Sequence, residues 1–218
     1  MARLFSPQAD TIARLVIIGV IMCPLLLWGL AHALSGSDYA TGRNTALPQP
    51  VPFSHEHHVG EMGIQCQFCH ASVETNAVAG APSLHVCMTC HSQLWTGAPV
   101  LAPLREAAAR NQPLAWRRVT RLPDYVYFDH HVHLANGIGC AECHGDVAHM
   151  PLTRQAMPMT MAWCVACHRD PGAHMRARDA LTDTEWLAHN SDAEAQAYLR
   201  AYLIGDTRRL TDCSTCHR

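Results

Sequence analysis

The hydrophobic pattern divides the chain into one long apolar run and a long, mostly polar remainder. Residues 15–34 read LVIIGVIMCPLLLWGLAHAL and contain no Lys, Arg, Asp or Glu. A run of about 20 apolar residues is long enough to cross a bilayer as a helix. We therefore expect one transmembrane helix here, which Pro24 kinks or locally loosens in mid-span.

Basic residues flank this run on one side only. Arg3 and Arg14 precede it, whereas 35–38 (SGSD) follow it. The positive-inside rule then predicts that residues 1–34 form a cytoplasmic N-terminus and signal anchor in a bacterial inner membrane, with the remainder in the periplasm. A cleaved signal peptide is the alternative, because Ala31-His32-Ala33 resembles a cleavage site. The length of the run favours an uncleaved anchor.

After the anchor, residues 35–52 are predicted to form a tether. This stretch is rich in Gly, Ser, Thr and Pro, and three alternating prolines near its end favour an extended chain. Periodic patterns are short over the remaining residues, 53–218. We expect short helices at 101–109 and 183–205 and little other regular structure, with a modest apolar core.

The most specific pattern in the chain is Cys-x-x-Cys-His, which occurs five times and uses ten of the eleven cysteines. Each copy predicts a c-type haem attachment site, within or at the start of a short helix. Two cysteines at i and i+3 lie on one side of a helical turn, where both can form thioethers to one porphyrin, and the next histidine can bind the iron. The predicted attachment cysteines are Cys66, Cys69, Cys87, Cys90, Cys140, Cys143, Cys164, Cys167, Cys213 and Cys216, and the predicted proximal ligands are His70, His91, His144, His168 and His217.

Structural zinc sites are the main alternative for paired cysteines. Zinc does not require a histidine after the second cysteine, yet all five copies have one. An odd number of cysteine pairs also combines poorly into four-ligand sites. A disulfide framework leaves the histidines unexplained, so five covalent c-type haems are the favoured cofactors. The eleventh cysteine, Cys23, lies in the apolar run and is interpreted as an ordinary apolar residue.

A second motif, Phe-x-His-x-x-His, supplies candidates for the distal axial positions. It occurs at 53–58 and 128–133, and each copy precedes a haem motif. Histidines at i and i+3 share a helix face, while their tips can diverge to two irons. The predicted distal ligands are therefore His55, His58, His130 and His133. The additional histidines His57 and His131 leave the register open.

The two motifs together indicate an internal repeat. Residues 53–91 and 128–168 are predicted to be two copies of a two-haem unit, and 213–217 carries a fifth haem at the end of the chain. The expected fold is mostly irregular and α-helical, with one N-terminal transmembrane helix and a haem-packed cytochrome c domain over 53–218. Five haems supply the apolar mass that the core lacks.

The fifth distal ligand is left open between histidine and methionine. A methionine ligand raises the potential of its haem above that of bis-histidine neighbours. Met161 and Met150 are the methionines singled out, because each lies near a haem motif. The other candidates are Met157, Met159, His85, His149, His174 and His189.

Charge changes this picture little. The chain has 16 basic and 18 acidic side chains, so no strongly basic balance indicates nucleic acid as a partner. Residues 92–127 are locally basic. The arginines there are either a solvated surface or a site for haem propionates or an acidic partner; they are Arg105, Arg110, Arg117, Arg118 and Arg121.

The ordered combination of these features resembles a known family. One span, five Cys-x-x-Cys-His copies and paired Phe-x-His-x-x-His motifs occur together with 87–91 (CMTCH), 122–133 (LPDYVYFDHHVH), 161–168 (MAWCVACH) and 212–218 (DCSTCHR). Over nearly its whole length the chain is similar to the pentahaem cytochrome c subunit of alternative complex III, a membrane quinol:electron acceptor oxidoreductase that replaces the bc1 complex in some bacteria. The resemblance implies a haem fold like that of the class III multihaem cytochromes.

The resemblance also implies partners and a role. The partners are the iron–sulfur, quinol-site and monohaem cytochrome subunits of the complex, together with a periplasmic electron acceptor. Quinol is oxidised in another subunit, so this chain is expected to conduct electrons and to contain no catalytic residue. A methionine ligand, if present, is unique among the five.

Two other functions are weighed against this one. A stand-alone membrane-anchored multihaem quinol dehydrogenase that feeds a periplasmic reductase also has one span and several haem motifs. A multihaem enzyme such as a nitrite reductase needs an open distal position, whereas here the distal candidates outnumber the haems. The tandem histidine motifs favour the complex subunit.

Overall fold

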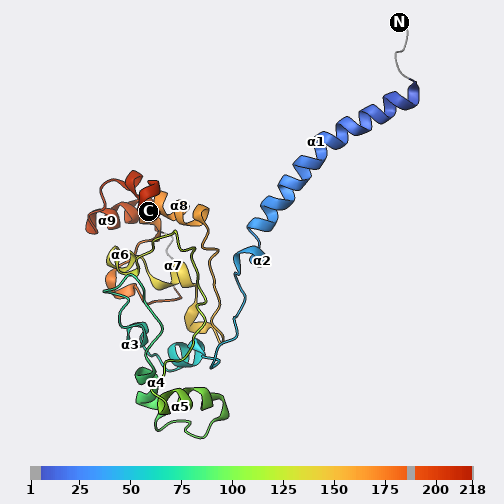
Figure 1. Cartoon of the computed structure of the whole chain (residues 1–218). Helices are drawn as coiled ribbons and strands as arrows, with labels where there is room; N and C mark the ends of the chain where they lie inside the picture. Colours follow the sequence, from blue (N-terminus) through green and yellow to red (C-terminus); the bar gives the residue numbers. More distant parts are fainter. Residues whose placement is uncertain (1–5, 186–189, 218) are drawn as a thin grey trace. The chain divides into compact units, whose positions relative to one another are not determined.

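The structure, a computed structural model, describes residues 6–185 and 190–217. The chain divides into two compact units (Figure 1), which we call the N-terminal unit (Met1–Gly42) and the C-terminal unit (Arg43–Arg218).

The N-terminal unit consists of the long helix α1 (Pro7–Ser35) and the short helix α2 (Asp38–Thr41). Ser6 starts α1 by accepting a hydrogen bond from the N–H of Ala9 at 3.2 Å. Since this cap lies well before the apolar run, α1 begins earlier than the predicted residues 15–34. The helix continues through Pro24 without a break.

Helix α1 is the candidate membrane span among the described residues. Its segment Gln8–Ser35 has a mean hydropathy of 2.3 and is long and apolar enough to cross a bilayer. An ion pair of 2.8 Å between Arg14 and Asp10 lies near its start, and from residue 15 to its end it carries no Lys, Arg, Asp or Glu.

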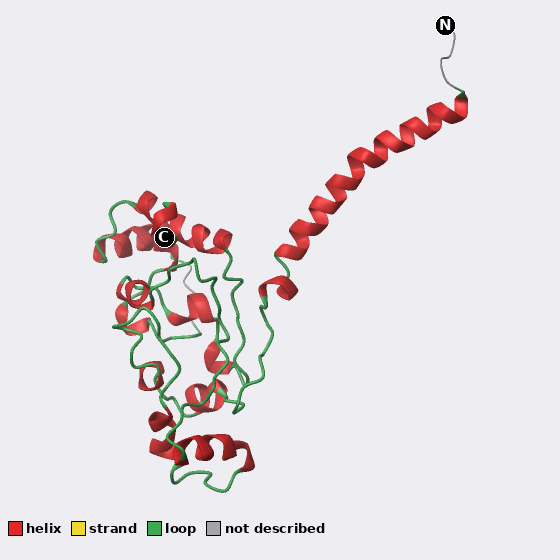
Figure 2. Ribbon diagram, in the orientation of Figure 1, coloured by secondary structure: helices red, strands yellow, loops and turns green. Residues whose placement is uncertain are grey.

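The C-terminal unit is built from short helices joined by irregular chain (Figure 2). The described residues contain no strand, only isolated antiparallel bridges such as Val126–His217. The mostly irregular and helical fold predicted from the sequence is therefore confirmed. The elements are η1 (Glu56–Glu61, a π-helical turn), α3 (Cys66–Cys69), α4 (Leu84–His91), η2 (Pro99–Leu101), α5 (Ala102–Ala109), α6 (His130–Ala135), α7 (Cys140–His144), η3 (Val147–His149), α8 (Met161–Arg169), η4 (Pro171–His174), η5 (Arg178–Ala180), α9 (Asp192–Ala201), η6 (Thr207–Thr211) and α10 (Cys213–Cys216).

Local sequence explains where several of these helices start and end. Asp129 caps α6 by accepting from the N–H of Val132, and Thr160 caps α8 by accepting from that of Trp163. Gly145, with φ of +65°, ends α7 in a conformation that favours glycine. Each Cys-x-x-Cys-His copy begins or lies in a short helix, as predicted.

Two helices predicted from the pattern differ in accuracy. The helix expected at 101–109 is confirmed as α5. The helix expected at 183–205 is wrong in extent, because α9 spans only Asp192–Ala201. Ser191 fixes its start through a capping box with Glu194, in which each side chain bonds the other residue's backbone N–H. Residues 186–189 of the predicted helix lie outside the described residues.

The boundary between the units lies inside the predicted tether. The N–H of Asn44 donates to the carbonyl of Gln155 at 2.8 Å, and the Gln49 side chain exchanges two 2.9 Å hydrogen bonds with the backbone of Arg117. Val51 is buried. The part of the predicted tether after Gly42 therefore packs within the C-terminal unit.

The apolar core is small. Its main cluster, Val51, Leu101 and Leu104, lies beside α4 and α5, with Leu84, Met88 and Trp116 packed against it. Other buried apolar side chains, among them Leu134, Met150 and Met175, are scattered through the C-terminal unit. Packing of this extent agrees with the modest core expected from the sequence.

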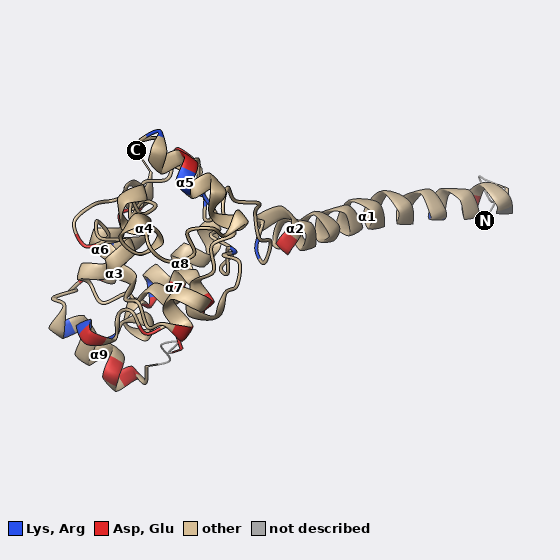
Figure 3. Ribbon diagram, turned by 90° about the horizontal axis from the view of Figure 1, so that it is seen from below, with Lys and Arg blue, Asp and Glu red and all other residues tan. Residues whose placement is uncertain are grey.

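Charged side chains of both signs are spread over the C-terminal unit (Figure 3). In the basic stretch 92–127, Arg105 donates to the carbonyl of Ala98 at 2.9 Å and Arg110 pairs with Glu106 at 3.2 Å. These two arginines therefore make local structural contacts.

Candidate cofactor-binding site

The five Cys-x-x-Cys-His motifs lie on α3, α4, α7, α8 and α10. In Figure 1, α4 and α5 lie at one end of the C-terminal unit, and α8, α9 and the C-terminus lie at the opposite end. Helices α3 and α7 lie between these ends. The motifs are thus distributed along the unit rather than gathered at one place.

Three histidines of the Phe-x-His-x-x-His motifs face a motif histidine. The ring centroids are 6.2 Å apart for His58 and His91, 6.4 Å for His130 and His144, and 6.0 Å for His133 and His168. Two imidazoles that bind one metal ion by bonds of about 2 Å have centroids at about this separation, once the two ring radii are added. Each pair is therefore spaced to hold one metal ion from opposite sides.

The fourth histidine of these motifs, His55, lies near His70. Burial, together with the charges of His70, His58 and His144, lowers the pKa of His55 to about 4. His70 is the largest of these charge effects. The four predicted distal histidines thus lie near the histidines of four different motifs.

Hydrogen bonds fix one ring nitrogen of each of the four distal candidates and of four motif histidines. Metal-binding histidines generally donate from the other ring nitrogen, which sets the tautomer and the ring orientation. Here the Nδ1 atoms bond to neighbouring oxygens, so Nε2 is the nitrogen left for a metal. The distal candidates bond as His55–Thr153 Oγ1 (2.8 Å), His58–Ser54 O (2.8 Å), His130–Ala77 O (2.9 Å) and His133–Asp129 O (2.8 Å), and the motif histidines as His70–Gly80 O (3.0 Å), His91–Leu94 O (3.3 Å), His168–Leu210 O (2.7 Å) and His217–Tyr125 O (3.1 Å).

Burial keeps several of these imidazoles neutral. It lowers the pKa of His144 to about 4, with smaller contributions from the charges of His130 and His70. Burial is also the largest cause of the lowered pKa values of His58 and His133. A neutral imidazole is the form that binds a metal, so the electrostatics favour ligation at neutral pH.

The two Phe-x-His-x-x-His motifs have matching internal geometry. Phe53 stacks on His58 at 4.4 Å and meets His55 edge-on at 4.9 Å. Phe128 stacks on His133 at 4.4 Å and meets His130 edge-on at 4.7 Å. Each phenylalanine therefore orients both histidines, although the first motif leads into the π-helical turn η1 and the second into α6.

The histidines outside this register have different surroundings. The ring of His57 bonds through Nδ1 to the carboxylate of Glu61 at 2.7 Å, and its side chain is 47% exposed. Its ring also lies 6.2 Å from that of Trp95. His131 is exposed. The structure thus brings His55, His58, His130 and His133 to the motifs, in the register expected from the sequence.

The last motif is held against the segment before α6. The N–H of Tyr127 donates to the carbonyl of Cys216 at 2.9 Å, and the rings of Tyr125 and His217 lie 5.8 Å apart. Of the fifth-ligand candidates, Met161 is 70% exposed at the start of α8, whereas Met150 is buried.

The histidine candidates for the fifth position are also dispersed. His149 bonds to the carboxylate of Asp146 at 2.8 Å, and His174 to that of Glu142 at 3.0 Å. His85 is exposed on α4, and His189 lies outside the described residues.

Contacts between side chains of different motifs show which motifs are neighbours in space. The Cys140 side chain is the largest cause of the lowered pKa of Cys66, so the two thiols lie close together. Burial raises the pKa of Cys69, and the charge of Cys87 adds to it. Burial likewise raises the pKa of Cys164, and the charge of Cys216 adds to it. The motif at Cys66 therefore lies between those at Cys87 and Cys140, and the motif at Cys164 lies beside that at Cys213.

Hydrogen bonds and shared helices support the same order. His55 and His58, at the start of η1, reach the motifs at Cys66 and Cys87, and the paired histidines of α6 reach the motifs at Cys140 and Cys164. His168, next to Cys167, bonds to Leu210, which closely precedes the last motif. These contacts place the motifs in a row in the order Cys87, Cys66, Cys140, Cys164 and Cys213.

This arrangement fits haem better than structural zinc. Among the described residues, no group of three or more His, Cys, Asp or Glu side chains converges to hold a metal ion. A tetrahedral zinc site needs four such ligands. A haem iron needs only one ligand from each side of the porphyrin, and the spacing of the histidine pairs suits this need.

Comparison with known proteins agrees with the motifs. Residues 126–218 match the family model described as cytochrome c7 and related cytochrome c. The matched region contains the second Phe-x-His-x-x-His motif and three of the five Cys-x-x-Cys-His motifs.

One curated relative is the protein named "Menaquinone reductase, multiheme cytochrome c subunit" from Nitratidesulfovibrio vulgaris. It is 35% identical over 97 residues, which cover 44% of this chain and 45% of the relative. The chain therefore matches less than half of that protein's length. The two comparisons and the motifs together show a multihaem cytochrome c with covalently attached c-type haems, similar in part to a cytochrome subunit of menaquinone reductase.

Proposed function

We propose that this chain is a membrane-anchored pentahaem cytochrome c that conducts electrons within a quinol-oxidising complex of the alternative complex III type. The observation that carries the proposal is the row of five attachment motifs, four of which have a second histidine near the motif histidine. Haems held at these motifs would supply one-electron transfer, and a histidine pair would bind the iron at four of them.

The proposed axial pairs follow from the ring contacts. His91 pairs with His58, His144 with His130, and His168 with His133. His70 pairs with His55, which lies close enough for their charges to interact. Nδ1 hydrogen bonds hold seven of these eight rings in place, and His144 is held by burial.

The row also supports the repeat proposed for 53–91 and 128–168. In each of these segments one phenylalanine orients two histidines, and the two histidines serve the two motifs that follow. The two segments meet where Cys66 contacts Cys140. The motif at Cys213 then extends the row beyond the second unit.

The proposed position of the chain is across the inner membrane, with the haem domain in the periplasm. Helix α1 is long and apolar enough to span the bilayer, and Arg14 lies at its N-terminal side. The proposed partners are iron–sulfur, quinol-site and monohaem cytochrome subunits, and a periplasmic electron acceptor. The similarity to a subunit of a menaquinone reductase supports a quinone-linked membrane complex.

Purification of the tagged chain from detergent-solubilised membranes tests the proposal. We expect iron–sulfur and multi-span quinol-site subunits to copurify. Menaquinol should reduce the haems in the complex, and the same chain separated from its partners should react far more slowly, because it contains no quinol-oxidising site of its own.

The alternative is a stand-alone quinol dehydrogenase that feeds a periplasmic reductase. It predicts a different result in the same experiment. If the isolated chain oxidises menaquinol as fast as the membrane preparation does, the chain itself contacts quinol and the role as a subunit of a larger complex is wrong.

A further inference from the structure

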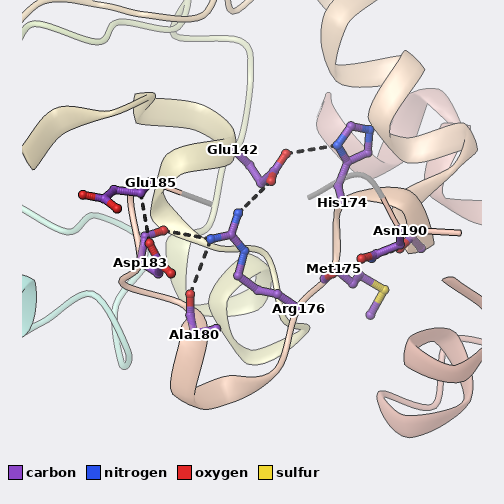
Figure 4. A network of polar contacts seen from close by, with 9 residues as sticks. Glu142, His174, Met175, Arg176, Ala180, Asp183, Glu185 and Asn190 are labelled. Carbon is purple, nitrogen blue, oxygen red and sulfur yellow. Dashed lines mark hydrogen bonds and ion pairs between the residues drawn. The ribbon is translucent and has the colours of Figure 1, made fainter. Parts of the chain in front are cut away.

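A buried arginine lies beside the central motif of the row. The side chain of Arg176 has no exposed surface. Its Nη2 donates to Oε1 of Glu142 at 2.8 Å, and its Nη1 donates to the carbonyl of Asp183 at 2.9 Å (Figure 4). Glu142 occupies one of the two x positions of the motif Cys140-Ala-Glu-Cys-His, so the arginine bonds directly to α7, the helix that carries this motif.

The backbone is adapted to this contact. An added Cβ at Gly139, the residue before α7, would lie 2.5 Å from Nε of Arg176, which leaves no room for a side chain. The N–H of Arg176 donates to the carbonyl of Gly137 at 2.8 Å, and its carbonyl accepts from the hydroxyl of Tyr202. The guanidinium is thus pressed against the start of α7.

Glu142 lies between two basic groups. Its second oxygen, Oε2, lies 3.0 Å from Nδ1 of His174, on the side away from Arg176 (Figure 4). The carboxylate is 11% exposed, so its charge is only weakly screened by water.

The same carboxylate is connected to two motif helices. Glu142 is part of α7, which carries the motif at Cys140. Its partner His174 lies in η4, which closely follows α8 and packs on it, and α8 carries the motif at Cys164. A charge at this position would act on a haem at either motif.

We propose that Glu142 and Arg176 are positioning residues that set the reduction potentials of the two haems attached at Cys140/Cys143 and Cys164/Cys167. The carboxylate stabilises the oxidised, more positive form of these haems and the guanidinium opposes it. Arg176 also holds α7 against the turn at Gly139. This proposal rests on the proposed function only in requiring haems at those two motifs.

Opposite single substitutions test this charge balance. Glu142→Gln keeps the shape and removes the negative charge, so the potential of the Cys140 haem should rise most and that of the Cys164 haem less. Arg176→Met removes the positive charge, so the same two potentials should fall. We expect the oxidised-to-reduced ratio of the more affected haem to change at least tenfold, about 59 mV for a one-electron couple.

The measurement is a spectroelectrochemical titration of the purified full-length holoprotein, fitted to five one-electron steps. The reduction potentials of two steps should shift, and those of the other three should stay unchanged. Exposed residues nearby provide matched controls: Asp179→Asn and Arg178→Met remove the same charges where water screens them, and should leave all five steps in place. The double variant with Glu142→Gln and Arg176→Met should return close to the original potentials.

Haem content by pyridine haemochrome assay separates the two possible failures. If the unaltered protein lacks haem at these motifs, the proposed function fails first. If all haems are present and Glu142→Gln leaves every step unchanged or lowers one, this inference is wrong. Should Arg176→Met fail to fold, Arg176→Lys keeps the charge, so it should retain the potentials while lowering the melting temperature, and Glu142→Gln still decides the sign.

Discussion

The imidazole rings of His133 and His168 lie 6.0 Å apart, one on α6 and the other within the haem motif of α8. Three residues before His133, on the same short helix, His130 faces His144 at 6.4 Å. A single turn of helix therefore reaches two motifs that are separate in the sequence. Because Asp129 caps this turn and Phe128 packs on both rings, its geometry is set locally.

Replacement of His133 by alanine should leave one haem without a distal ligand. That haem should become high-spin, because an iron with one axial histidine and an open position has a weaker ligand field. Low-temperature EPR and carbon monoxide binding by the reduced protein would report one altered site. His131→Ala is the matched control, since His131 is exposed and outside the register. If His131→Ala gives the high-spin signal instead, the assigned register is wrong.

The haem motif at Cys213 lies at one end of the row, so its loss should be tolerated better than loss of a central motif. Changing Cys213 and Cys216 to alanine should lower the haem content from five to four per chain. Changing Cys140 and Cys143 should lower the yield of folded protein as well, because α7 contacts Arg176 and the motif at Cys66. Pyridine haemochrome assay and intact mass would measure both effects. Stoichiometric zinc, or three or fewer haems in the unaltered protein, would contradict the assignment.

Features set by neighbouring residues could be predicted from the sequence. Each motif helix is specified by a few consecutive residues and a capping residue. The helix over 101–109 is specified by a short amphipathic pattern. The histidines that lie near the motif histidines could also be singled out from the sequence, because Phe-x-His-x-x-His is a local signal that occurs twice. Helix α9 was placed too broadly, since its start depends on the reciprocal bonds of Ser191 and Glu194 rather than on hydrophobic periodicity.

Features that depend on contacts between distant segments could not be predicted. The order of the motifs in the row differs from their order in the chain, because Cys66 rather than Cys87 meets Cys140. The burial of Arg176 carries no sequence signal, since arginine is rarely buried without a partner and its partner Glu142 lies far away in the chain. The packing of Asn44 and Gln49 likewise depends on residues beyond position 110.

The anchor should remain on the mature protein. Helix α1 continues through the Ala31-His32-Ala33 segment, and its apolar stretch is longer than the apolar region of a typical signal peptide. N-terminal sequencing should therefore find a start before the apolar run at residues 15–34, and the protein should stay with the membrane in a carbonate wash. A start near Leu34 together with release into the wash would instead establish cleavage.

Met161 is the methionine whose position best suits the fifth distal site. It starts α8, lies three residues before Cys164 and is largely exposed, and α8 packs on η6, which leads into the motif at Cys213. Met150, by contrast, is buried near Gly145, beside a motif whose histidine already faces His130. A methionine ligand gives a sulfur–iron band in magnetic circular dichroism, and it raises the potential of its haem.

Met161→Leu should therefore abolish that band and lower one potential, with little loss of stability at an exposed position. Met150→Leu is the control: it conserves volume, so it should cost less than about 1.5 kcal/mol of unfolding free energy and keep the band. If the unaltered protein shows no such band, the fifth ligand is a histidine. His149 and His174 are then the described candidates whose Nδ1 atoms are already fixed by a carboxylate, as is usual for a metal-binding imidazole.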